Sequence, residues 1–312
     1  MINTVVSLKQ AVGENLTIKK NTLAPDFPTG KEKRICIVSG LYGDEIQGQY
    51  VCYEVIKRIK KQYDMLTGIV DVYPSINPLA LEAKSREIPG SELDMNTMFP
   101  GTPSGVLGEY LAYSLMSDME GADFCVDVHG SNMYLKEMLQ IRLDDENADK
   151  LVSYARFLNT DMVWVHPSTQ VKDGSLCYEL NKRGVKCFVS EAHFAYGIDF
   201  DYGNRLVDGI FALMKEVGIW QGRISYIKKP LLIYDKNVDY INSDTSGIFI
   251  PKKKLYDKVK EKEVIGYVID TITGSVNEEI LATKDGIISA LRAYPAIEEG
   301  SLITRIVEEV YE

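Results

Sequence analysis

The chain is constrained most by an alternation of short apolar runs with longer amphipathic stretches, which extends from residue 33 to residue 222. A continuous apolar run is typical of a strand buried on both faces of a sheet, whereas apolar residues at helical spacing indicate a helix that covers one face. Strands that alternate with helices form right-handed crossovers and a mostly parallel sheet. The pattern therefore predicts a doubly wound α/β domain over residues 1–222.

The individual elements can be placed from these runs. Strands are predicted over residues 35–38, 69–73, 124–128, 162–165 and 185–189. Helices are predicted over residues 46–62, 106–115 and 151–158 and from residue 207 onward. The first 30 residues are expected to add an edge strand or a hairpin. In a sheet of this kind, functional sites lie beyond the carboxyl ends of the strands.

The last third of the chain has a different character. After Trp220 the apolar runs shorten, and turn signals recur at residues 244–247, 273–274, 285–286 and 299–300, with Val, Ile and Tyr between them. Short strands separated by such turns are typical of an all-β unit. The sequence therefore predicts a smaller C-terminal all-β domain over residues 223–312.

Charge and hydropathy exclude several classes of partner. The 45 acidic residues outnumber the 35 basic ones and give a formal net charge of −10, which repels nucleic acid. No apolar run approaches the length of a membrane span. The N-terminus lacks a basic segment followed by an apolar one, so the chain is expected to be cytoplasmic. The expected partner is a small molecule, and homo-oligomerisation stays open.

Polar side chains stand at the ends of three predicted strands. Glu45 follows the first strand, His129 the third, and Glu191 the strand over residues 185–189. Arg86 lies in the segment between the second and third strands. Because the carboxyl ends of parallel strands meet at one edge of a sheet, these side chains are expected to converge.

One chemistry requires such a set. Amide or ester hydrolysis can use a metal held by imidazole and carboxylate, a general base, and a cation near the developing oxyanion. Glu45 and His129 suit the metal, Glu191 the base and Arg86 the oxyanion. Each also has a structural interpretation: Glu45 as a helix N-terminal acid, His129 as a capped core histidine, and Glu191 as a solvated loop carboxylate.

Segments along nearly the whole chain, in the family's order, resemble motifs of the succinylglutamate desuccinylase/aspartoacylase family. Residues 40–48 resemble its G-x-H-G-[DN]-E-x-x-G motif. The segments Asn77-Pro78, Arg86-Glu87-Ile88-Pro89 and Asp94-Met95-Asn96 with Phe99-Pro100-Gly101 resemble N-P…R…D-L-N-R-x-F-P-G. Asp127-Val128-His129 resembles D-L-H, and Val189-Ser190-Glu191 resembles v-E-l-G. The β-rich tail is similar to the family's C-terminal domain.

This resemblance implies a sheet of zinc-carboxypeptidase type and a zinc-dependent hydrolase that cleaves an acyl-amide or related bond of a small acylated molecule. It implies that Glu45 and His129 bind zinc. Glu191 would act as general base or acid through the metal-bound water, and Arg86 would polarise the scissile carbonyl. Asn96 would contact a carboxylate of the substrate.

Two positions depart from the family pattern. Tyr42 stands where the motif has its first zinc-binding histidine, and a phenol with an ordinary pKa near 10 is a poor ligand at neutral pH. Thr97 stands where the family has arginine, which removes a bidentate partner for a substrate carboxylate. A third metal ligand would then be Tyr42, His193 or His166, and the sequence leaves that choice open.

Other functions compete with the hydrolase. The chain can be a family member without catalytic activity, which binds a ligand in the cleft that other members use as their active site, with weak or no metal. Tyr42 and Thr97 favour this alternative. The tail can alternatively be a lipoyl-like carrier with Lys284 as the modified residue, although the usual flanking residues are missing. Substrate specificity is expected to come from loops over residues 135–143 and 170–175.

Overall fold

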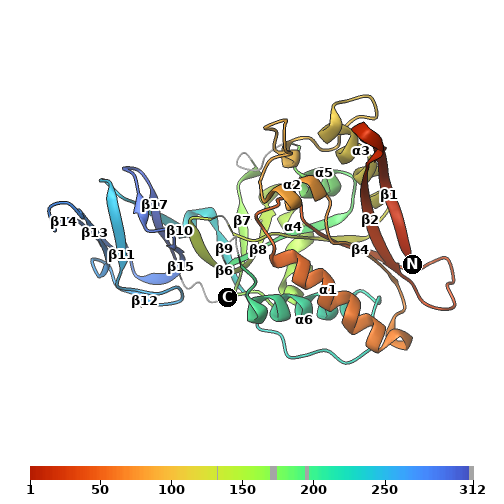
Figure 1. Ribbon diagram of the computed structural model, residues 1–312. Coiled ribbons are helices and arrows are strands. Elements are labelled where there is room, and N and C mark those ends of the chain that lie inside the picture. The colour runs from red at the N-terminus through yellow and green to blue at the C-terminus, as the bar shows by residue number, and fades with distance from the viewer. Residues whose placement is uncertain (132, 169–173, 194–196, 309–312) are drawn as a thin grey trace.

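The computed structural model describes residues 1–131, 133–168, 174–193 and 197–308, with only the backbone at 192 and 193, and it is built on one long mixed sheet (Figure 1). The helices are α1 (Gln47–Lys61), α2 (Pro78–Ala83), α3 (Leu107–Met119), α4 (Asp145–Ala155), α5 (Leu176–Lys182) and α6 (Phe200–Glu216). The first strands are β1 (Ile2–Lys9), β2 (Asn15–Leu23), β3 (Arg34–Ser39), β4 (Ile69–Tyr73), β5 (Phe124–Val128), β6 (Leu135–Asp144), β7 (Met162–His166), β8 (Lys186–His193) and β9 (Leu231–Tyr234). Among these described helices, none is both long and apolar enough to cross a lipid bilayer.

The centre of the sheet is parallel and covered on both faces. Strands β4, β3, β5 and β8 lie side by side in parallel. Ile35 and Ile37 of β3 belong to the core beneath α1 and α6, whereas Cys36 and Val38 belong to the core beneath α3 and α5. All four side chains are fully buried, which explains why this strand is apolar without alternation. The predicted strands and the helical layers on both faces are confirmed.

The prediction that the sheet is mostly parallel is wrong. The hairpin of β1 and β2, expected in outline for the first 30 residues, adds to β4 in antiparallel orientation. At the other side, β6 runs antiparallel to β8. The connection from β5 to β6 spans only residues 129–134, whereas a parallel crossover needs about a dozen residues. The sheet is therefore mixed, with its parallel strands at the centre, and the likeness to zinc carboxypeptidases stays a prediction.

The segment over residues 135–143, predicted as a specificity loop, is strand β6. Of its polar residues, Glu137 and Gln140 are almost inaccessible inside the sheet, whereas Lys136 is exposed. A β-bulge between Glu137 and Gln140 also breaks the simple alternation by which a strand is identified. Of the second predicted loop, residues 170–173 lie outside the described residues.

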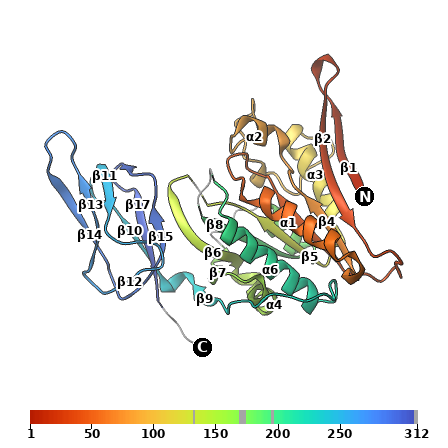
Figure 2. The same cartoon turned by 60° about the horizontal axis from the view of Figure 1, so that its bottom comes forward.

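The C-terminal third is all β, as predicted. Its strands are β10 (Val238–Asn242), β11 (Gly247–Pro251), β12 (Lys258–Val259), β13 (Val264–Ile269), β14 (Val276–Leu281), β15 (Gly286–Arg292), β16 (Ala296–Ile297) and β17 (Leu302–Val307). Strands β14, β13, β11 and β16 form a separate small sheet, whereas β15 pairs with β6 and extends the long sheet (Figure 2). The domain boundary at residue 222 stays a prediction. Strand β9 follows that boundary in the sequence, but it pairs with β7 of the long sheet.

Lys284 does not have the setting of a carrier lysine. Its ammonium lies 2.8 Å from Asp239 and 3.3 Å from Glu308 and donates to the Asn237 carbonyl, and its side chain is only 19% exposed. A carrier lysine must be free to enter another active site. These contacts therefore disfavour the carrier hypothesis.

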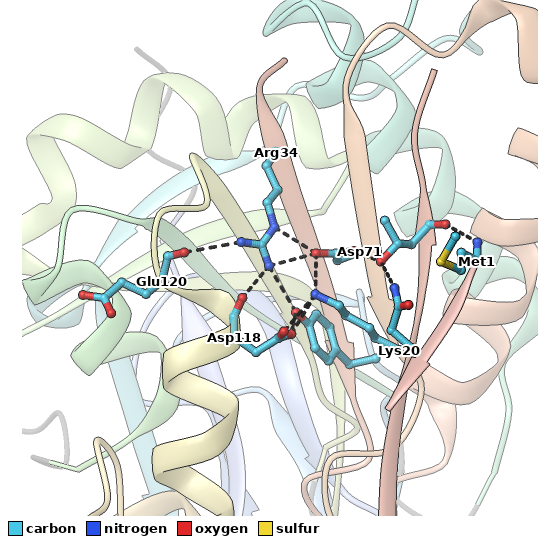
Figure 3. A network of polar contacts seen from close by, with 9 residues as sticks. Met1, Lys20, Arg34, Asp71, Asp118 and Glu120 are labelled. Carbon is cyan, nitrogen blue, oxygen red and sulfur yellow. Dashed lines mark hydrogen bonds and ion pairs between the residues drawn. The ribbon is translucent and has the colours of Figure 1, made fainter. Parts of the chain in front are cut away.

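A buried carboxylate fastens the N-terminal hairpin to the sheet. Asp71 of β4 is 2% exposed and lies 3.1 Å from the ammonium of Lys20 and 2.8 Å from the guanidinium of Arg34 (Figure 3). The Thr22 hydroxyl donates to its second oxygen. Asp118 of α3 accepts from Lys20 as well, so the network joins β2, β3, β4 and α3. Both cations depend on Asp71 to offset the cost of their partial burial.

Replacing Asp71 with alanine should lower the free energy of unfolding by about 3 kcal/mol, because it leaves Lys20 and Arg34 without their shared partner. Urea unfolding would measure the change. Asp64→Ala, at an exposed position, is the control and should change stability by less than about 0.5 kcal/mol. Equal losses in the two variants would contradict this account of the network.

Candidate active site

The five side chains singled out in the sequence line one cavity of about 510 Å³. They are Glu45, Arg86, Asn96, His129 and Glu191. The cavity lies where the parallel strands end: one residue follows β5, one lies within β8, and one precedes α1. The structure therefore brings all five together, as the strand-end pattern predicts. Their chemical roles stay predictions.

The loop that carries Tyr42 and Glu45 depends on one glycine. A Cβ atom at Gly43 would lie 1.7 Å from the carbonyl oxygen of Ala80 in α2, which no side chain tolerates. The Gly43 amide also donates to the Ser85 carbonyl at 2.8 Å, beside Arg86. This close packing positions the loop against the segment that supplies the arginine.

Glu45 and His129 form a buried pair in the cavity. Each is 6% exposed, and His129 Nδ1 lies 3.0 Å from Glu45 Oε2. The Gly130 amide donates to the same oxygen at 3.1 Å. Burial raises the pKa of Glu45, and although burial alone would lower the pKa of His129, the carboxylates of Asp127 and Glu45 raise it. The pair therefore favours a shared cation, either a proton or a metal ion.

The second ring nitrogen of His129 is also held. Nε2 lies 3.0 Å from Asp127 Oδ2, which places a proton on Nε2 and leaves Nδ1 directed at Glu45. A carboxylate behind the imidazole is the usual arrangement around metal-binding histidines. Two ligands of a tetrahedral zinc ion stand about 3.3 Å apart. The observed 3.0 Å between Nδ1 and Oε2 fits that spacing, so these two residues suit a divalent metal.

Tyr42 does not suit the same ion. Its side chain is 5% exposed, and burial raises the pKa of its phenol above the ordinary value. Its hydroxyl lies 3.4 Å from Asp94 Oδ2, and its ring is 5.4 Å from that of His129. A phenol that resists deprotonation next to a carboxylate is a poor zinc ligand. Tyr42 therefore lines the cavity as a neutral group.

Arg86 lies over the ring of Tyr42 and close to two carboxylates. Its guanidinium carbon is 3.6 Å from the ring centroid. Its nitrogens are 3.6 Å from Glu45 Oε1 and from Asp94 Oδ2, distances at which neither contact is a strong hydrogen bond. With 46% of its side chain exposed, Arg86 keeps donors available to a substrate oxygen.

The side-chain oxygen of Asn96 is already engaged in a hydrogen bond. This oxygen, Oδ1, accepts the backbone N–H of Leu176 at 3.0 Å and so fixes the start of α5. The neighbouring Thr97 hydroxyl donates to the Asp94 carbonyl at 2.8 Å. Asn96 therefore has a structural role in addition to the substrate contact that the resemblance implies.

Glu191 has the perturbed acidity expected of a general base or acid. Burial raises its pKa to about 7, although Arg142 acts in the opposite direction. Arg142 Nη1 lies 2.7 Å from Glu191 Oε1 and holds that carboxylate in place. A carboxyl group that titrates near neutral pH can accept and return a proton efficiently.

The sequence analysis missed Arg142 and Arg305, which both line the cavity. Arg142 lies in the strand that was predicted as a loop. Arg305 comes from β17, far along the chain, and no local signal links it to the strand ends. The one hint that the sequence offers is that Glu137 and Arg142 stand among the apolar residues of this segment.

The remaining histidines do not complete a metal site among the described residues. His166 lines the cavity, but its ring stacks on Trp164 at 4.1 Å, and burial together with Arg142 lowers its pKa to about 4. No group of three or more His, Cys, Asp or Glu side chains suited to a metal ion occurs in the described part of the chain. The His193 side chain lies outside the described residues, so its role as a ligand stays a prediction.

Comparison with known proteins finds the same family that the sequence motifs resemble, over most of the chain. Residues 31–217 match the succinylglutamate desuccinylase/aspartoacylase catalytic domain. The N-alpha-acetyl-L-2,4-diaminobutyric acid deacetylase of Halomonas elongata is 23% identical over 293 residues, which cover 90% of this chain and 84% of that protein.

Two solved structures share the fold. A succinylglutamate desuccinylase/aspartoacylase from Rhodobacter sphaeroides superposes with a TM-score of 0.81 at 17% identity, over 99% of this chain and 96% of that one. The product-bound ectoine utilization protein of Ruegeria pomeroyi gives a TM-score of 0.83 at 18% identity, over 98% and 94%. With the catalytic-domain match over more than half of its length, the chain belongs to the succinylglutamate desuccinylase/aspartoacylase family.

Proposed function

We propose that this protein is a zinc-dependent deacylase that hydrolyses the amide bond of a small N-acylated molecule. The observation that carries the proposal is the single cavity in which a carboxylate–imidazole pair with metal-ligand spacing faces a base and a cation. The relatives support the reaction class, since one is a deacetylase and the family is named in part for desuccinylation.

Glu45 and His129 would hold the metal ion. When bound there, the ion would act as a Lewis acid that makes a water molecule more acidic and polarises a carbonyl. Asp127 would keep the imidazole of His129 oriented and in the correct tautomer. The Gly130 amide would fix the direction of the Glu45 carboxylate in the same way.

Glu191 and Arg86 would carry out the proton transfer and charge stabilisation. Glu191 would remove a proton from the attacking water and then deliver it to the leaving amine, which its pKa near 7 permits. The guanidinium of Arg86 would donate to the carbonyl oxygen as negative charge develops there. Its modest contacts with Glu45 and Asp94 leave donors free for that bond.

The substrate is expected to differ from those of typical family members at one subsite. Thr97 replaces an arginine fork, and its hydroxyl is occupied by the Asp94 carbonyl. A carboxylate at this subsite would therefore lack that fork, and the amide of the neighbouring Asn96 already holds α5 through its oxygen. We infer that substrates with a free carboxylate there bind less tightly than they would to an arginine-containing relative.

A second candidate function is a binding protein that has lost catalysis. Tyr42 favours it, because the site then has two firm protein ligands where hydrolytic zinc sites ordinarily have three. Metal content after purification without added zinc separates the two functions. Stoichiometric zinc supports the deacylase, whereas metal-free protein that binds acylated amino acids without releasing amine supports the silent alternative.

Glu191→Gln should lower kcat about 100-fold or more, because the amide cannot accept a proton while it can still accept the bond from Arg142. Amine release from a panel of N-acetyl and N-succinyl amino acids and diamino acids would measure it. Glu54→Gln is the matched control, since that buried glutamate lies on α1 and pairs with Lys57 away from the cavity. A Glu191→Gln variant as active as the control would remove Glu191 from the mechanism.

The activity should fall as the pH drops below neutrality. Only the ionised form of Glu191 can act as base, so kcat/KM should rise with pH and level off above an apparent pKa near 7. A pH profile of initial rates would test this dependence. If the acidic limb lay near pH 4, the ordinary range of a glutamate, the raised pKa would not describe the working enzyme.

Tyr42→His should raise the zinc affinity by about tenfold or more, because a neutral imidazole supplies a third ligand without losing a proton. Competition with a chelator would measure the affinity, and Tyr42→Phe, which adds no ligand, should give no gain. If Tyr42→His left the affinity unchanged while His193→Ala abolished it, His193 would be the third ligand. If neither variant altered zinc binding, the metal site assigned to these positions would be wrong.

A further inference from the structure

The candidate base Glu191 is one end of a row of charged side chains that crosses the sheet. Arg142 bonds Glu191 through Nη1 at 2.7 Å and Glu137 through Nη2 at 3.1 Å. The opposite oxygen of Glu137 is paired with Arg305 of β17. Two carboxylates therefore alternate with two guanidiniums, and the last of them comes from the C-terminal part of the chain.

The β-bulge in β6 makes this row possible. On β8, Glu191 and His193 are two residues apart, but the residues that pair with them on β6, Gln140 and Glu137, are three apart. The extra residue brings Glu137 to the face that Gln140 and Arg142 share, where an unbroken strand would turn it away. The Gln140 amide then donates to Glu137 at 3.1 Å.

A small residue lets Arg305 reach Glu137 across an intervening strand. Glu137 on β6 is opposite Ala290 on β15, and Ala290 is opposite Arg305 on β17. The two charged residues are thus separated by two strand spacings, about 10 Å, which a long arginine can cover only over a short side chain. The ring of Trp164, 5.3 Å from the Arg305 guanidinium, packs beside it.

Within the row, each charged side chain is stabilised by the opposite charges next to it. Glu137 is 1% exposed; burial would raise its pKa, but Arg142 and Arg305 outweigh burial and lower it. Without Arg305, one oxygen of this buried carboxylate would lose its cation. Arg142, the remaining cation, would then be drawn toward Glu137 and away from Glu191, which also lies in the field of His129 and Glu45.

We propose that Arg305 is a positioning residue for Glu191, acting through Glu137 and Arg142, so that the C-terminal strands complete the active site. The proposal rests on the proposed function only in giving Glu191 the role of base. Arg305 itself need not touch the substrate, since its effect would pass through the two intermediate side chains.

The competing interpretation is that Arg305 merely anchors the C-terminal strands to β6. Arg292 offers a matched control, because it also lies at this junction, on β15 opposite Leu135. Its guanidinium donates to the carbonyls of Tyr294 and Ala296 and lies over the ring of Tyr134, with no part in the cavity lining. An anchoring role predicts similar effects for the two arginines.

Kinetics of variants provide the first test. Arg305→Met should lower kcat about tenfold or more and change KM less than about threefold, as expected when a base is displaced but binding is retained. Arg305→Lys should keep most of the activity, because Arg305 bonds Glu137 through a single nitrogen that an ammonium can replace. Arg292→Met should leave kcat unchanged.

A double variant sharpens the test. Adding Glu137→Gln to Arg305→Met removes the unpaired carboxylate that would attract Arg142, so the double variant should recover part of the activity lost in Arg305→Met. If Arg305 were only an anchor, the second substitution would bring no recovery. Equal kcat in wild type and Arg305→Met would likewise overturn the proposal.

A spectroscopic readout makes the result independent of turnover. In full-length protein labelled with ¹³C at glutamate carboxyl groups, the Glu191 resonance is identified by its absence in Glu191→Gln. At neutral pH, Arg305→Met should move this resonance toward its protonated value, because Glu191 loses part of the cation that stabilises its charge. Arg292→Met should not move it.

Failure of the proposed deacylase function and failure of the positioning role would give different results. A shifted resonance in a protein that hydrolyses no member of the acyl panel would contradict the proposed deacylase function and support the positioning role. An unshifted Glu191 resonance in Arg305→Met would overturn the positioning role, whether or not the wild-type protein releases amine.

Discussion

The contact between Glu45 and His129 is the interaction on which the site depends. Two groups that accept hydrogen bonds lie 3.0 Å apart, and each is only 6% exposed. Such a pair needs a positive charge between its atoms, and both pKa shifts favour one. Asp127 and the Gly130 amide hold the pair in this arrangement from outside. The surrounding loops and strand ends serve to keep these groups together.

The mixed sheet explains how one cavity receives groups from distant parts of the chain. Its parallel centre delivers the ends of β3, β5 and β8 to a single edge. The antiparallel strand β6 then extends the sheet toward the C-terminal strands and carries Arg142 to Glu191. A fully parallel sheet would place a helical crossover there instead. The departure from parallel order is thus what joins the second part of the chain to the cavity.

The parts of this site that follow from short-range patterns are those that the sequence analysis could predict. Glu45, His129 and Glu191 each stand beside an apolar strand, and strand order brings them together without further information. Arg305 meets Glu137 only through the register of three antiparallel strands and the small size of Ala290. No periodicity encodes that pairing. The bulge in β6 hid the strand for a related reason, because it breaks the alternation that identifies one.

The most direct measurement is anomalous diffraction at the zinc absorption edge from crystals grown with equimolar zinc. The account predicts one ion within about 2.3 Å of both His129 Nδ1 and Glu45 Oε2, with the imidazole still bonded to Asp127. An ion at another site, or a direct hydrogen bond between His129 and Glu45 that persists in zinc-saturated crystals, would contradict it.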